Sequence, residues 1–168
     1  MIDLTEYYGF PDESILSEAN GISENHLYAD FRSWRSRESF VQMWSFEEQL
    51  LAYPGDLDSE EAALEFLDQS ECAATGLDHF VGSAVVALLL AGAVPFSSCG
   101  GGPGHFETHP LVAFWCDRAS AGPILRAAES AGVCVSGASG DLRGLVVWTE
   151  RDVLVLRNFA KQLALLAE

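Results

Sequence analysis

One short segment of the chain, residues 97–109, places side chains that could act as a nucleophile, a base or a metal ligand close together in the sequence. It reads SSCGGGPGHFETH and contains the thiol of Cys99, the imidazoles of His105 and His109, and the carboxylate of Glu107. Thiolate, imidazole and carboxylate groups are the ligands that zinc takes in proteins. One alternative for this segment is therefore a metal site that uses Cys99, His105 and His109.

The same segment is also compatible with a thiol-dependent enzyme. Cys99 would be the nucleophile and His105 the residue that activates it. The three glycines at 100–102 could point their N–H groups into one concavity, as in anion nests and oxyanion holes. Neither pattern is specific, because the glycines match neither a phosphate-binding P-loop nor a dinucleotide fingerprint. We therefore predict a flexible hairpin loop with no catalytic residue, no bound metal and no cofactor, and keep both chemistries as alternatives.

The net charge of the chain is strongly negative and unevenly distributed. The 168 residues carry 25 acidic and 9 basic side chains, for a formal charge of −16. Residues 1–80 hold 18 acidic and 3 basic residues, whereas residues 81–168 hold 7 and 6. Nucleic acid and anionic lipid attract Lys and Arg, so we expect neither as a partner. A negative surface steers a basic protein toward it, and such a protein is the partner that we predict.

The acidic half also contains the aromatic residues expected of a protein-binding surface. Trp, Tyr and Arg anchors near the centre of an interface supply most of the binding energy, and surrounding charges accelerate encounter. The candidate partner-binding residues are Trp34, Trp44, Glu47, Glu48, Tyr53, Asp56, Asp58, Glu60, Glu61, Glu65 and Asp68. In size and charge alone, the chain resembles inhibitors, toxin-neutralising immunity proteins and secretion chaperones. We favour such a binding module over an enzyme, with a subunit of a larger assembly as a further alternative.

Periodicity and turn residues predict an α+β domain that positions these groups. Helices are expected over 45–53, 60–71, 79–91, 117–131 and 150–167, and strands over 93–98, 110–116, 133–137 and 142–148. Residues 27–44 fit a strand or a helix equally well. The second half therefore has the order α-β-β-α-β-β-α, which predicts a two-layer sandwich with a mainly antiparallel sheet.

Several of these boundaries depend on individual capping residues. Ser45 with Glu48 has the pattern of a capping box, and Asp78 is placed to cap the helix 79–91. Pro123 is compatible with its helix only in the first turn.

We expect a single domain over residues 1–168, in which the acidic residues 1–76 pack on an α+β core at 77–168. The apolar run at 80–96 is too short and too interrupted to span a membrane, and it divides into a buried helix and a strand. The four cysteines form no Cys-x-x-Cys pair, and the first residues lack the basic and apolar regions of a secretory signal. These features predict a cytoplasmic protein.

Overall fold

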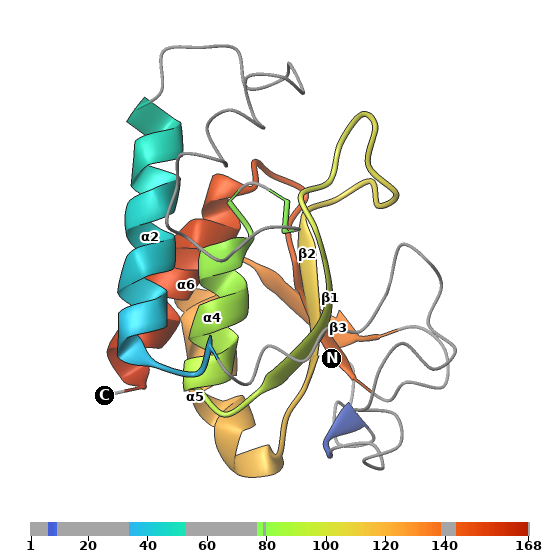
Figure 1. Ribbon diagram of the computed structural model, residues 1–168. Coiled ribbons are helices and arrows are strands. Elements are labelled where there is room, and N and C mark those ends of the chain that lie inside the picture. Colours follow the sequence, from blue (N-terminus) through green and yellow to red (C-terminus); the bar gives the residue numbers. More distant parts are fainter. Residues whose placement is uncertain (1–6, 10–33, 53–76, 79, 139–143, 168) are drawn as a thin grey trace.

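The computed structural model describes residues 7–9, 34–52, 77–78, 80–138 and 144–167, and within these it contains four helices and one antiparallel sheet (Figure 1). From Gly82 onward the elements follow the order helix, strand, strand, helix, strand, strand, helix. The predicted α+β class and the order of elements in the second half are therefore confirmed. The expected helix at 60–71 lies outside the described residues.

The sheet consists of two hairpins that meet at its centre. Its strands are β1 (Val94–Cys99), β2 (Leu111–Trp115), β3 (Cys134–Gly137) and β4 (Leu145–Trp148), and their order across the sheet is β1-β2-β4-β3. All neighbours are antiparallel, with Cys99 opposite Leu111 and Leu111 opposite Trp148. The loop between β1 and β2 therefore leaves the sheet at the end where β4 finishes.

The helices gather on one face of this sheet. They are α2 (Arg37–Ala52), α4 (Gly82–Leu90), α5 (Arg118–Ala131) and α6 (Leu154–Leu166). Their buried side chains form one cluster with Val112, Phe114, Leu145 and Val147, whereas the opposite face of the sheet carries a separate cluster around Phe96 and Trp115. The helices and the sheet thus form two layers.

Helix α4 lies at the centre of the molecule (Figure 1). Eight of its nine residues are buried, and it contacts α2, α6, β1 and β2. Its sequence, GSAVVALLL, has no polar side apart from Ser83, and an all-apolar helix must be covered on every side. The rest of the same chain supplies that cover. None of the helices among the described residues is long and apolar enough to cross a bilayer.

The acidic half contributes one long helix to the same core, and its start differs from the prediction. Helix α2 runs without a break through Ser45, so the expected capping box of Ser45 with Glu48 does not form. Ser36 instead stands one residue before the helix begins, and its hydroxyl oxygen accepts a hydrogen bond from the Ser39 N–H at 3.0 Å. Helical spacing then buries Phe40, Met43, Phe46 and Leu50 against the other helices.

Helix α5 confirms two of its predicted boundaries and corrects a third expectation. Asp117 caps its start by accepting from the Ser120 N–H at 2.7 Å, and Gly132 ends it in the left-handed region at φ 72°. Pro123, however, is the sixth helical residue and lies in the second turn. Since a proline has no N–H, the carbonyl of Ala119 lacks its usual helical donor. The helix continues because its two ends are capped and one of its faces is buried.

A buried ion pair ties three helices together. Glu47 is 1% exposed, and its two carboxylate oxygens accept from the Ser83 N–H at 2.9 Å and from the Arg157 Nε at 3.1 Å. The same guanidinium also binds Glu48 and lies 3.6 Å from the centre of the Trp44 ring. The Glu47 carboxylate thus satisfies a free N–H at the start of α4, and Arg157 neutralises the charge of that carboxylate inside the protein.

Burial also shifts the proton affinity of this carboxyl. Desolvation raises the pKa of Glu47 above its usual value of 4.5, and the hydrogen bonds from Ser83 and the charge of Arg157 only partly oppose the shift. A carboxyl with a raised pKa binds its proton more tightly in the folded state than in the unfolded state. Its contribution to stability is therefore present below pH 4.5 and is lost as the pH rises through the raised pKa.

We therefore predict that the wild-type protein loses stability relative to the Glu47→Gln variant as the pH rises above 4.5. The loss should be about 1.4 kcal/mol for each unit by which the pKa is raised. Urea unfolding of both proteins across the acidic and neutral range measures the difference. If the wild type instead gains stability relative to Glu47→Gln as the pH rises, the charge of Arg157 outweighs desolvation.

Candidate functional site

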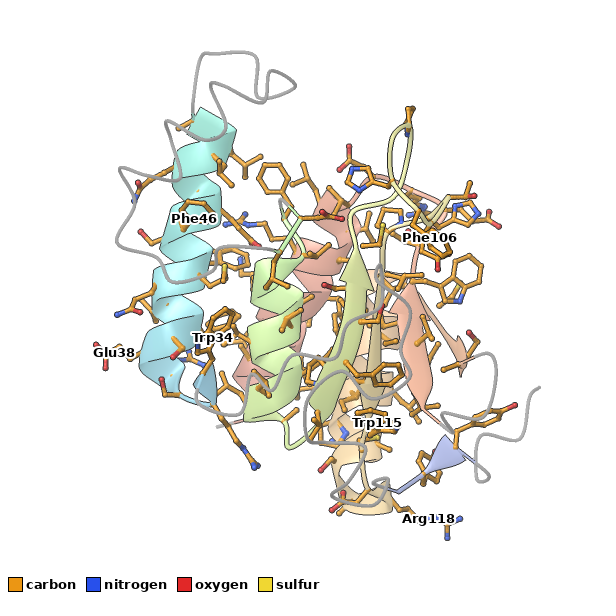
Figure 2. All side chains as sticks on the ribbon, turned by 45° about the vertical axis from the view of Figure 1, so that its right-hand side comes forward. Trp34, Glu38, Phe46, Phe106, Trp115 and Arg118 are labelled. Atoms are coloured by element: carbon orange, nitrogen blue, oxygen red, sulfur yellow. The ribbon has the colours of Figure 1, made fainter. Side chains whose placement is uncertain are left out.

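The loop between β1 and β2 is anchored at both ends by the sheet. Cys99 is the last residue of β1, pairs with Leu111 and is 7% exposed. Gly101 has a φ of +71°, and a Cβ atom there would lie 2.4 Å from the Pro110 nitrogen, so only glycine fits this close approach of the two loop ends. Figure 2 shows the exposed Phe106 on this loop, at the opposite end of the sheet from Trp115.

Asp78 joins the loop from the turn that precedes α4. Its Oδ2 atom accepts from the Gly100 N–H at 2.6 Å and lies 3.0 Å from the His105 Nδ1 atom. Sequence reasoning predicted Asp78 as the cap of α4, and this was wrong, because α4 begins only at Gly82 and no side chain caps it from Val81. Glu47 binds the Ser83 N–H at the start of α4, and the Asp78 carboxylate binds the loop.

The turn that presents Asp78 has an unusual backbone. Phe80 has a φ of 67°, in the left-handed region that a bulky side chain rarely adopts, and it is the one non-glycine residue with a positive φ among those described. Such conformations persist where the surrounding structure fixes them, and they are concentrated at functional sites. Here the turn carries the chain from the loop contacts of Asp78 into the buried helix α4.

Three chemically different side chains converge as a result. One carboxylate oxygen of Asp78, the Cys99 Sγ and one ring nitrogen of His105 all lie within 4.8 Å of one another. The Gly101 N–H donates to the Cys99 Sγ at 3.4 Å, so the sulfur has a fixed position. We call these three residues the loop site. Within the described part of the chain, it is the one group of three or more metal-ligating side chains that is close enough to share an ion.

The structure separates the two histidines of the loop. His105 belongs to the loop site, but the ring of His109 packs against Trp148 with 5.7 Å between the ring centres. Neither His109 nor Glu107 is among the converging donors. The metal site that the sequence suggested, with Cys99, His105 and His109 as ligands, therefore forms only in part. Asp78 takes the place of His109. No local spacing could have indicated Asp78, because it precedes Gly100 by 22 residues.

The glycine amides do not form the anion nest that the sequence suggested. The N–H groups of Gly100, Gly101 and Gly102 donate to the Asp78 carboxylate, the Cys99 sulfur and the Thr108 carbonyl, respectively. An oxyanion hole needs N–H groups that are available to the reacting oxygen. The observed bonds therefore favour an acceptor-rich site for a cation over a thiol enzyme.

The structure distributes the candidate partner-binding residues among several environments. Glu47 is buried in its ion pair and contributes nothing to the surface. Trp44 is partly buried beneath Arg157, Trp34 is partly buried against the helices, and Glu48 is 55% exposed while bound to Arg157. The remaining candidates lie outside the described residues: Tyr53, Asp56, Asp58, Glu60, Glu61, Glu65 and Asp68.

No match was found when the chain was compared with protein families, with curated proteins and with solved structures. The charges of the chain itself show a clear division. The described residues carry 9 acidic and 7 basic side chains, which leaves 16 acidic and 2 basic residues in the segments outside them. The helices and the sheet are thus nearly neutral, and 14 of the 16 net negative charges belong to other parts of the chain.

The three described cysteines should differ in their reactivity. Cys134 is exposed, Cys99 is 7% exposed, and Cys116 is fully buried, where desolvation and then the charge of Asp117 raise its thiol pKa from 9.0 to about 12. That shift reduces the thiolate of Cys116 about 1000-fold at neutral pH. We predict alkylation in the order Cys134, Cys99, Cys116, measured by timed iodoacetamide labelling and peptide mass spectrometry. Labelling of Cys116 before Cys134 in the folded protein would contradict the structure.

Proposed function

We propose that this protein binds a divalent transition metal of the zinc class at the loop site. The observation that carries the proposal is the convergence of the Asp78, Cys99 and His105 donor atoms within 4.8 Å. One carboxylate and one thiolate supply two negative charges to a divalent ion, and a neutral imidazole completes a borderline-soft ligand set.

The spacing of the donors supports this proposal. With bonds of about 2.0–2.3 Å, two ligand atoms on a tetrahedral zinc ion lie about 3.3–3.8 Å apart. The Asp78 Oδ2 and His105 Nδ1 atoms are hydrogen-bonded at 3.0 Å, so a bound ion would replace the proton between them with a small increase in their separation. Because no pair of donor atoms exceeds 4.8 Å, movements of about 1 Å would bring all of them onto one ion.

The scaffold around the donors also supports it. Cys99 is held by strand pairing and by the Gly101 N–H, and Asp78 is held by the Gly100 N–H. Ligands that the protein already holds in place lose less conformational freedom when the metal binds. His105 is held by its contact with Asp78 and by its N–H, which donates to the Gly102 carbonyl at 3.2 Å.

The histidine pair provides a matched test. We predict that the purified protein binds about one zinc ion per chain and that zinc raises its melting temperature. His105→Gln should weaken zinc binding by about 100-fold or more, and Cys99→Ser and Asp78→Asn should also weaken it. His109→Gln, a change of the same type on the same loop, should leave the affinity within about 3-fold of the wild type. Metal content by plasma mass spectrometry and competition with a chelating dye measure both. Equal losses in the two histidine variants would contradict the proposal.

A second function is favoured by the division of charge. We propose that the acidic segments outside the described residues attract a basic protein partner, while the nearly neutral helices and sheet serve as their scaffold. Most of the negative charge lies within 10–33 and 53–76, so it belongs to two segments of the sequence and not to the described helices and sheet. Concentrated charge accelerates association, and the acceleration weakens as salt screens it.

Two triple variants of equal net charge test this second proposal. A partner captured from the native cell should associate about 10-fold more slowly with a variant neutralised at Asp56, Glu60 and Glu61. A control neutralised at Glu38, Glu129 and Glu150, all in the described helices and loops, should associate nearly as fast as the wild type. Stopped-flow or surface-plasmon measurements at several salt concentrations give the rates. Equal slowing in both variants would show that only the total charge matters.

A further inference from the structure

A tetrahedral metal ion has four ligand positions, and three protein donors would fill only three of them. Structural zinc sites are closed by four protein ligands, whereas catalytic sites keep three and leave the fourth to water or substrate. Among the described residues, Asp78, Cys99 and His105 are the whole converging set. Three donors from the described part of the chain correspond to the number in a catalytic site.

The exposure of the three donors shows on which side the fourth position would lie. Cys99 is 7% exposed and forms the floor of the loop site, whereas the side chains of Asp78 and His105 are each 37% exposed and form its rim. An ion held by these groups would have protein below it and solvent beyond the rim. Water would reach it from that side.

Among the described residues, two glycines of the loop have open space beside them. Cβ atoms added at Gly102 or Gly104 would meet no other atom within 4 Å. The loop's second imidazole, at His109, is directed to Trp148 and is not a converging donor. Neither these glycines nor His109 adds a fourth donor to the loop site.

We propose that the loop site is an open site, in which a bound metal ion keeps one position for water or a small anionic ligand, as hydrolytic zinc enzymes do. This inference rests on the proposed metal binding. It specifies the class of ligand, an oxygen or nitrogen anion that replaces the metal-bound water molecule. The ion would act on that ligand as a Lewis acid.

Cobalt in place of zinc makes both the metal and its fourth ligand visible. Full-length protein loaded with one Co²⁺ ion should show a sulfur-to-cobalt charge-transfer band, which is lost in Cys99→Ser. Azide should then shift the d–d bands in a saturable titration with one anion per ion, and perchlorate at the same ionic strength should leave them unchanged. His109→Gln should retain the full azide response.

The outcomes separate this inference from the proposed function. Absence of the charge-transfer band overturns metal binding at Cys99, and the open site with it. A normal band whose d–d spectrum is indifferent to azide leaves the metal site standing and overturns the open position. In that case, an azide response gained in His79→Gln or Cys72→Ser would identify a fourth protein ligand that closes the site.

Discussion

The enclosure of α4 is the constraint on which the rest of the structure depends. A helix with the sequence GSAVVALLL has no side that can face water, so the sheet must cover one side of it and other helices the remainder. That requirement brings α2, from the acidic half, into the same core as α6 from the other end of the chain. The two-layer arrangement follows from enclosing one apolar segment.

The polar contacts at the start of α4 follow from the same enclosure. Deep burial leaves the first N–H groups of the helix without water, and the Glu47 carboxylate reaches one of them at Ser83. A carboxylate brought this far inside requires a cation, which Arg157 supplies from α6. Asp78, which precedes this helix, does not cap it, and its carboxylate binds the β1–β2 loop instead. Polar contacts at the start of α4 thus join it to α2, α6 and that loop.

The second half of the fold could be predicted because its signals are local. Asp117 and Gly132 bound α5 at its two ends, and the short apolar runs around Phe96 and Phe114 lie between glycine, proline and polar residues. The start of α2 could not be predicted, since its aromatic residues suit a strand as well as a helix and only packing on α4 decides. The burial of Glu47 and the role of Asp78 depend on contacts across the fold, which a single sequence does not display.

The Asp78 contacts also bear on how the molecule would come apart. Asp78 is bound to Gly100 and His105, which lie 22 and 27 residues further along the chain, and all of α4 and β1 lies between them. An ion shared by Asp78, Cys99 and His105 would act as a cross-link that closes this segment into a ring. Because that ring contains the central helix and the edge strand, binding of the ion would stabilise the core as well as the surface loop.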